Sequence, residues 1–173
     1  MEFQSTKFKD LYIINFPLFK DNRGSLIKPW ISSDFHSIFG DNMETYVTKS
    51  YAGSVRGLHY QEGEFAQKKI IVCISGKIED VAIDLRRNSD TYGKVFNQTL
   101  SESEGQALLI PEGFAHGVYA YEESIFMMIS DKEYLPSKEK GILWSSVPIF
   151  NNFDISKVSE KDSKLPLFKD IIL

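Results

Sequence analysis

The chain has 173 residues, of which 42% are hydrophobic and 25% charged, so its length and composition fit one packed domain over residues 1–173 rather than a disordered chain. Its net charge of −4 argues against a nucleic-acid-binding protein, which needs a basic face. No apolar run approaches the roughly 20 residues that span a bilayer, and no secretory signal pattern opens the chain. We therefore predict a soluble, cytoplasmic protein with neither a nucleic acid nor a membrane as its partner.

Short apolar or alternating segments recur along the chain and predict strands at 11–14, 69–75, 78–85, 95–100, 106–110, 117–121 and 124–129. Gly76-Lys77 is expected to form a tight turn, and Glu122-Glu123 the tip of a hairpin. Helix signals are few: 32–40 predicts a short helix and 136–141 a single helical turn. Many short strands with little helix predict an all-β, antiparallel sandwich or barrel, whose mouth can hold a ligand. The tail, 156–173, is expected to pack on the barrel or on a second subunit.

The segment 54–61 concentrates polar chemistry among apolar and aromatic neighbours. Side chains alternate between the faces of a strand. A regular strand would therefore place Gly57, His59 and Gln61 on one face, and Arg56, Leu58 and Tyr60 on the other. Only three histidines occur in the chain, and a second one, His116, lies in another polar segment, 111–117. His59 is thus a candidate acid–base group, because imidazole titrates near neutral pH.

Each candidate residue also has a structural interpretation. His59 could be a hydrogen-bonded core histidine, and Lys69, at the start of an apolar strand, could be a lysine that protects a sheet edge. The functional alternative for Lys69 is a cation aimed at a developing oxyanion. Arg23 lies on a turn and is either a solvated arginine or a phosphate ligand. Asp162 lies in a charged run near the end of the chain, and by itself this run predicts only a solvent-exposed surface. His36 is expected to be structural or exposed.

The sequence argues against a metal centre. Barrel metal sites of the cupin kind use a His-x-His pair, and here the second position is Gln61, whose amide is a poor ligand for transition metals. Only His116 could fill a distant third position. We therefore predict no metal and no cofactor. Cys73, the single cysteine, is expected to be a buried core thiol.

The ordered motifs resemble those of the dTDP-4-dehydrorhamnose 3,5-epimerase family over nearly the whole chain. The matching motifs are Phe19-x-Asp21-x-Arg23-Gly24, Arg56-Gly57-Leu58-His59-Tyr60-Gln61, Gln67-x-Lys69, Gly76 to Asp84 with Leu85-Arg86, Pro111-Glu112-Gly113-Phe114-Ala115-His116-Gly117, Tyr134-x-Pro136-x-x-Glu139-x-Gly141-Ile142-x-Trp144 and Ser159-Glu160-Lys161-Asp162. This resemblance implies a cupin-type jelly-roll barrel, a homodimer, and a reaction that needs no metal.

The resemblance also implies epimerisation at C3, C5 or both of a nucleotide-diphospho-4-keto-6-deoxy sugar, in deoxysugar or surface polysaccharide precursor synthesis. Both carbons are α to the C4 ketone, so loss of a proton gives an enolate. The family pattern makes His59 the base, Asp162 its hydrogen-bonding carboxylate, and Lys69 the cation that stabilises the O4 oxyanion.

The remaining matched positions are implied to bind substrate. In the family they hold the diphosphate or the sugar (Arg23, Arg56, His116) or lie near the nucleotide (Tyr134, Glu139), and Gln61 of the His59 block is assigned to substrate binding as well. Asp80 matches a barrel carboxylate to which we assign no chemistry.

Two departures from the family pattern stand out. The family's acid is a tyrosine in a Phe-x-Tyr pattern, but here the third position is Met128, which cannot donate a proton. Since a general acid contributes roughly 10²–10⁴ in rate, another donor such as water, Tyr119 or Tyr121 is needed, or one epimerisation is lost. Tyr134, six residues along, is too far away unless the chain turns back.

The second departure concerns the nucleotide. Family members often carry Gln-x-Asn before the His59 block, in contact with thymine, where this chain has 48–50, Thr-Lys-Ser. Sugars linked to GDP or CDP, including heptoses, therefore remain alternatives to dTDP-linked ones. So do three other functions: a 3,4-ketoisomerase, a non-catalytic sugar-nucleotide-binding protein, and a metal-dependent oxygenase of the cupin class.

Overall fold

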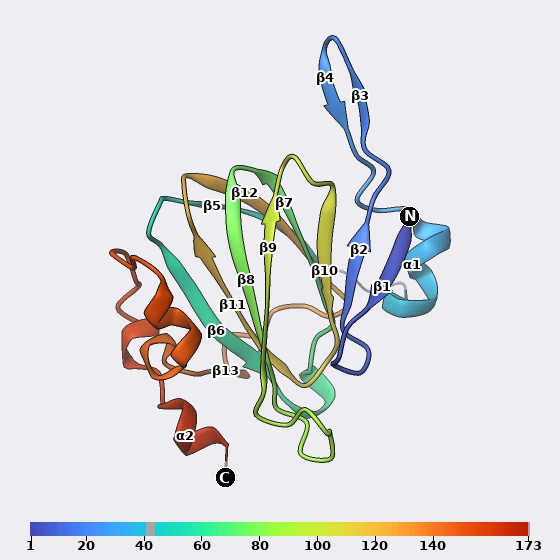
Figure 1. Ribbon diagram of the computed structural model, residues 1–173. Coiled ribbons are helices and arrows are strands. Elements are labelled where there is room, and N and C mark those ends of the chain that lie inside the picture. Colours follow the sequence, from blue (N-terminus) through green and yellow to red (C-terminus); the bar gives the residue numbers. More distant parts are fainter. Residues whose placement is uncertain (41–43, 173) are drawn as a thin grey trace.

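The computed structural model describes residues 1–40 and 44–172, in which two antiparallel sheets pack face to face as a jelly-roll barrel (Figure 1). In spatial order, the six-stranded sheet consists of β1 (Glu2–Ser5), β2 (Tyr12–Asn15), β10 (Gln106–Ile110), β7 (Lys69–Ser75), β12 (Ser124–Ser130) and β5 (Glu44–Ser50). The five-stranded sheet consists of β13 (Glu139–Gly141), β6 (Val55–Gln61), β11 (Phe114–Ala120), β8 (Lys77–Asp84) and β9 (Val95–Ser101). The predicted all-β fold is confirmed.

The other elements are short. A separate hairpin of β3 (Phe19–Asp21) and β4 (Gly24–Leu26) extends away from the barrel (Figure 1). The helices are α1 (Ser32–Phe39) and α2 (Phe168–Ile171), with 3₁₀ turns at Gly63–Phe65, Trp144–Ser146, Pro148–Asn152 and Asp162–Lys164. No helix in 1–40 or 44–172 is long and apolar enough to cross a membrane.

Strand alternation divides the apolar side chains into three layers. Between the sheets, Ile71 and Cys73 of β7 pack with Phe126 and Met128 of β12, and Cys73 is buried as predicted. The opposite faces of the same strands, such as Ile70 on β7, pack against α1. The outer face of the five-stranded sheet is covered by the C-terminal segment, which includes Val147, Phe150 and Phe168. The tail therefore packs back on the barrel, as one of the two expectations had it; residue 173 lies outside the described residues.

The sequence predicted β2 and β7 to β12 better than their connections, and it did not predict β1, β3, β4 and β5 as strands. The predicted helix at 32–40 is α1, and β7 and β10 have the predicted bounds. Glu122-Glu123 is a bend between β11 and β12, but these two strands belong to different sheets, so the predicted hairpin is wrong. The helical turn predicted at 136–141 is also wrong, because Glu139–Gly141 forms β13 by backbone pairing with β6. Local sequence cannot reveal either long-range pairing.

Asp84 fixes the loop between β8 and β9. Its side chain is fully buried and accepts hydrogen bonds from the Arg86 guanidinium at 2.8 and 2.9 Å, the Ser89 hydroxyl at 2.7 Å and the Thr91 hydroxyl at 2.6 Å. Burial alone would raise the pKa of the Asp84 carboxyl, but the hydrogen bonds outweigh it and lower that pKa from 3.8 to about 2.

We expect Asp84→Asn to lower the free energy of unfolding by about 2 kcal/mol at neutral pH. Because the folded protein holds the carboxyl below its usual pKa of 3.8, this stabilisation is present above that value and is lost as the pH falls towards 2. Urea unfolding at neutral and acid pH measures the difference, with the exposed Asp90→Asn as control. A difference that stays constant with pH would contradict the assignment.

Candidate functional site

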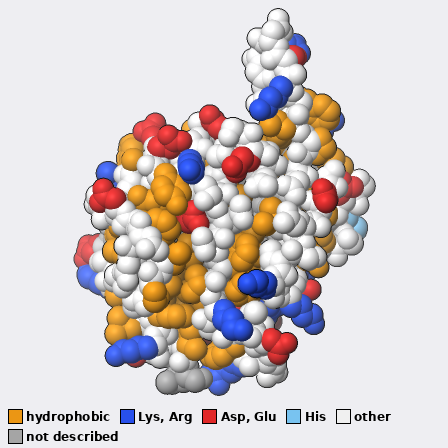
Figure 2. Space-filling model, viewed as in Figure 1, with side chains coloured by type: hydrophobic (Ala, Val, Ile, Leu, Met, Phe, Trp, Pro, Cys, Tyr) orange, Lys and Arg blue, Asp and Glu red, His pale blue; other side chains and the backbone are white. Residues whose placement is uncertain are grey.

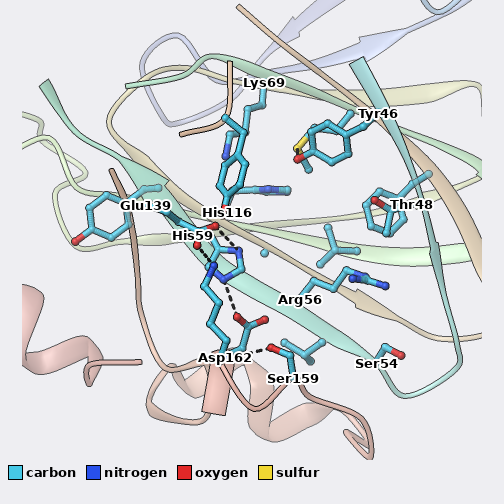
Figure 3. A pocket seen from close by; sticks show the side chains of 18 of the residues that line it. Tyr46, Thr48, Ser54, Arg56, His59, Lys69, His116, Glu139, Ser159 and Asp162 are labelled. Atoms are coloured by element: carbon cyan, nitrogen blue, oxygen red, sulfur yellow. Dashed lines mark hydrogen bonds and ion pairs between the residues drawn. The ribbon is translucent and has the colours of Figure 1, made fainter. Parts of the chain in front are cut away.

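A pocket of about 770 Å³ opens at one end of the barrel, between the two sheets (Figure 3). The five-stranded sheet contributes Arg56, His59, His116 and Glu139 to its lining. The six-stranded sheet contributes Tyr46, Thr48, Lys69, Phe126 and Met128. The segment 156–162 closes a third side. The wall from the five-stranded sheet, with its histidines, therefore faces the wall from the six-stranded sheet, with its lysine and tyrosine.

His59 and Asp162 form the central pair of the site. The Nε2 atom of His59 lies 2.8 Å from Oδ1 of Asp162, and Oδ2 of the same carboxylate accepts a hydrogen bond from the backbone N–H of Gly57 at 3.1 Å (Figure 3). An ionised carboxylate only accepts hydrogen bonds, so Nε2 of the neutral imidazole carries the proton and Nδ1 keeps the lone pair. Burial tends to raise the pKa of Asp162, but the bonds from His59 and Gly57 bring it below its usual value.

Gly57 allows this arrangement. Its φ is +102°, and a Cβ atom there would lie 2.6 Å from the carbonyl oxygen of His116 and 2.8 Å from the Cα of Gly117. Only glycine fits such a conformation and such a close approach. The pairing of β6 with β11 also shifts register at this point, so the strand does not alternate regularly.

The predicted division of β6 into two faces is therefore wrong for Arg56, which lines the same pocket as His59. The Arg56 guanidinium donates from Nε to the Ser50 hydroxyl at 2.8 Å and from Nη2 to the carbonyl of Lys49 at 2.9 Å. These two bonds from the end of β5 hold the cation at the mouth of the pocket.

A second carboxylate lies beside His59. Oε1 of Glu139 is 3.6 Å from Nδ1 of His59, and Oε2 pairs with the ammonium of Lys161. The imidazole thus lies between two carboxylates, both of which would stabilise the imidazolium form that follows proton uptake. The predicted place of Glu139 near the nucleotide stays a prediction.

His116 and Asp80 form a second, deeper pair. Nε2 of His116 is 2.9 Å from Oδ1 of Asp80, and both side chains are buried. Oδ2 of Asp80 is buried without a hydrogen-bond partner in the described part of the chain. Asp80, to which the sequence assigned no role, therefore orients His116.

Lys69 lies at the start of β7 and lines the pocket from the six-stranded sheet. Burial lowers the pKa of its ammonium from 10.5 to about 8, although the charges of Glu139 and Asp80 act in the opposite direction. The cation is therefore weakly solvated, as suits a group that meets a developing negative charge.

Of three further residues predicted to bind substrate, two line this pocket and one does not. The amide of Gln61 lines the pocket but donates to the carbonyl of Phe65 at 2.9 Å and accepts from the N–H of Leu135 at 2.8 Å, so it also holds two loops together. Tyr134 lines the pocket because the chain turns back after β12. Arg23 lies on the β3–β4 hairpin, paired with Asp21 at 2.6 Å, and is not among the residues that line this pocket.

Tyr46 was missed by the sequence analysis. It lies on β5 directly opposite Met128 of β12, and its hydroxyl donates to the sulfur of Met128 at 2.7 Å. The period-two series Tyr46, Thr48, Ser50 was the available signal, but no strand was predicted there. Tyr119 and Tyr121, the suggested alternative donors, bond to the Asp154 carbonyl and the Glu79 carboxylate, and neither is among the pocket-lining residues.

Within the described ranges, no group of three or more His, Cys, Asp and Glu side chains is arranged to hold a metal ion. The amide of Gln61 is also engaged by backbone groups. The expectation of a metal-free reaction stays a prediction.

The barrel and its pocket define a jelly-roll protein whose cavity is lined by two histidine–carboxylate pairs and by lysine and arginine cations. The family model described as dTDP-4-dehydrorhamnose 3,5-epimerase matches residues 5–170, and the chain belongs to this family of isomerases. The relative from Salmonella typhimurium is 35% identical over 97% of this chain and 96% of its own, and that from Methanothermobacter thermautotrophicus 34% identical over 92% and 90%.

Solved structures agree with this assignment. The dTDP-4-dehydrorhamnose 3,5-epimerase of Sulfolobus tokodaii is 36% identical, with a TM-score of 0.86 over 97% of this chain and 95% of that one. The enzyme of Elizabethkingia anophelis is 32% identical, with a TM-score of 0.84 over 100% and 99%. The predicted family and its cupin-type jelly roll are confirmed.

If Lys69 stabilises the O4 oxyanion, as the sequence predicts, we expect kcat/KM to fall as the pH rises above about 8, where its ammonium loses its proton and its charge. Lys69→Arg should move this alkaline limb upward, since a guanidinium stays protonated to beyond about pH 12. The shape of the pH profile is the readout, whatever the absolute rate of the variant. An alkaline limb at the same pH in both proteins would contradict the assignment to Lys69.

Proposed function

We propose that this protein epimerises a nucleotide-diphospho-4-keto-6-deoxy sugar at C3, C5 or both, with His59 as the base. The observation that carries the proposal is that the His59–Asp162 pair and Lys69 line one pocket, in a chain that belongs to the 3,5-epimerase family.

The proposed chemistry begins at a carbon next to the C4 ketone. Nδ1 of His59 takes the proton from that carbon, and the electron pair of the C–H bond moves to O4 to give an enolate. Asp162 holds the ring in the required tautomer, and together with Glu139 it stabilises the imidazolium. Lys69 stabilises the charge on O4, an effect of the kind worth roughly 10²–10³ in rate.

The cations at the mouth of the pocket support an anionic, diphosphate-linked substrate. Arg56 is held there by Ser50 and Lys49, and Lys157 and Lys161 line the third side. The related enzyme of Bacillus anthracis has been solved with TDP and pyrophosphate bound, and that of Legionella pneumophila with dTDP-4-keto-L-rhamnose. We propose a dTDP-linked sugar as the first choice, with GDP- and CDP-linked sugars as alternatives because Thr48 replaces the usual glutamine.

Deuterium exchange tests this function. In D2O with a dTDP-linked 4-keto-6-deoxy sugar, we expect solvent deuterium at C3, C5 or both; His59→Asn should abolish it, and Asp162→Asn should slow it by roughly 10²–10⁴. His36→Asn, on α1, is the matched control and should leave the rate unchanged. NMR of the product identifies the carbon. No exchange across dTDP, GDP and CDP sugars would contradict the proposal, and tight binding without exchange would favour the non-catalytic alternative.

We further propose that the protein works as a homodimer in which the β3–β4 hairpin reaches the partner's pocket. Figure 2 shows the hairpin as a knob projecting from the body. Its apolar Phe19 and Leu26 are 58% and 53% exposed, and the Arg23 side chain is 85% exposed. An exposed apolar hairpin indicates a protein–protein contact. Since Arg23 does not line the pocket of its own chain, a substrate-binding role for it requires a second subunit.

Subunit complementation tests this arrangement. We expect Arg23→Ala and His59→Asn each to be nearly inactive alone. After mixing, each heterodimer would combine an intact His59 with the partner's intact Arg23 in one of its two sites, which restores about a quarter of wild-type activity at random reassociation. Sedimentation checks that dimers form and exchange. No recovery in exchanged dimers, or a monomer at working concentration, would contradict the proposal.

A cytoplasmic location stays a prediction.

A further inference from the structure

We propose that Tyr46 is the general acid that returns a proton to the sugar ring on the face opposite His59. This inference rests on the proposed epimerase function. It adds a proton donor, Tyr46, that is not among the residues of the family motifs. Inversion at carbon needs such a group: the base removes hydrogen from one face, and a donor must deliver hydrogen to the other.

The place of Tyr46 in the sheet carries the argument. The tyrosine of the family pattern would stand at Met128, on β12. Tyr46 is the direct cross-strand partner of Met128 on β5, in the register that also pairs Thr48 with Phe126. Side chains directly opposite each other in an antiparallel pair have Cβ atoms about 5 Å apart and project to the same face of the sheet. A phenol moved by one strand can therefore still reach the same pocket.

The Tyr46 hydroxyl is held in a way that leaves its proton available. It donates to the thioether sulfur of Met128 at 2.7 Å, and a thioether is a weak acceptor. By contrast, Tyr121 bonds to the carboxylate of Glu79. Met128 is 6% exposed and packs in the core between the sheets, whereas Tyr46 is 41% exposed, and both residues line the pocket. Met128 therefore cannot donate a proton as the family tyrosine does, but its sulfur is a weak hydrogen-bond acceptor that positions the Tyr46 hydroxyl.

The two walls of the pocket give the required opposition. His59 and Glu139 come from the five-stranded sheet, whereas Tyr46 comes from the six-stranded sheet, together with Lys69. Figure 3 shows the Tyr46 ring directed into the pocket on the side away from Glu139. A sugar ring lying between the sheets would present one face to the base and the other to the phenol.

Other tyrosines that line the pocket do not share this position. Tyr134 comes from the segment after β12 and not from a strand: its backbone N–H donates to Glu44 at the start of β5, and its side chain lies near Lys161, which pairs with Glu139. Tyr60 follows His59 on β6 and packs with Leu58 and Val81 on the outer face of that sheet. Burial raises the pKa of Tyr46 to about 12, with smaller contributions from Glu44 and Glu139, so the phenol is protonated and able to donate at neutral pH.

The second half of the reaction then balances. The enolate carbon takes the proton of the Tyr46 hydroxyl, its electron pair forms the new C–H bond, and the C4 carbonyl is restored. The Tyr46 oxygen is left as a phenolate and His59 as an imidazolium. Water returns a proton to the phenolate and accepts one from the imidazolium, so each turnover inverts one carbon with no net gain or loss of protons.

The test separates proton exchange from inversion. In D2O we expect Tyr46→Phe to lower the rate of inversion by roughly 10²–10⁴. It should still incorporate deuterium at the same carbon with retained configuration, because His59 can remove and return hydrogen on its own face. Tyr51→Phe, just past the end of β5 and outside the pocket lining, is the matched control and should invert at the wild-type rate.

A double variant makes the test sharper. Tyr46→Phe/Met128→Tyr returns the phenol to β12 and should restore inversion to within about tenfold of wild type, a rescue that a purely structural role for Tyr46 would not give. Wild-type inversion in Tyr46→Phe would overturn the proposal, as would exchange without inversion in Tyr134→Phe instead. So would a double variant that exchanges normally but does not invert. A wild-type protein that neither exchanges nor inverts would instead contradict the proposed epimerase function.

Discussion

The contact between Asp162 and His59 is the constraint on which the site depends. It joins a barrel strand to the C-terminal segment across 103 positions of the chain, and the same carboxylate also binds the backbone of Gly57. One side chain thereby fixes the orientation of the imidazole and the conformation of the strand that carries it. The apolar packing of the C-terminal segment on the five-stranded sheet keeps the 4% exposed carboxylate in place.

From this constraint follows a pocket with two chemically different walls. The five-stranded sheet carries histidines paired with carboxylates: His59 with Asp162 from the closing segment, and His116 with Asp80 of β8. The six-stranded sheet carries a desolvated ammonium at Lys69 and a phenol at Tyr46. With the roles that we propose, a base on one wall and a cation and a proton donor on the other suit a reaction that removes and returns hydrogen beside a ketone.

The sequence predicted β2 and β7 to β12 because those strands show local apolar or alternating patterns, but it did not predict β1, β3, β4, β5 and β13. The apolar run of β7 and the ordered blocks around His59 and His116 needed no knowledge of distant contacts. The irregularity at Gly57 could not be predicted, because it depends on the approach of β11, and so Arg56 was assigned to the wrong face. Asp162 stood out only through the family resemblance, since its burial comes from folding and not from its polar surroundings in the chain.

Tyr46 illustrates a different gap. Met128 departs visibly from the family pattern, but the residue that we propose as its compensation, Tyr46, lies on a strand 82 residues earlier in the chain and becomes a neighbour only through sheet pairing. A single sequence contains no signal for that register. The two positions are direct cross-strand partners, so a phenol on β5 instead of β12 is displaced by only about one strand spacing.

The most direct test of the central claim is nitrogen NMR of the His59 ring in its neutral form, assigned by comparison with His59→Asn. The account predicts a proton on Nε2 and a lone pair on Nδ1, and a mixture of tautomers once Asp162 is replaced by Asn. A proton on Nδ1 in the wild-type protein would contradict the role given to Asp162 and, with it, the identity of the base.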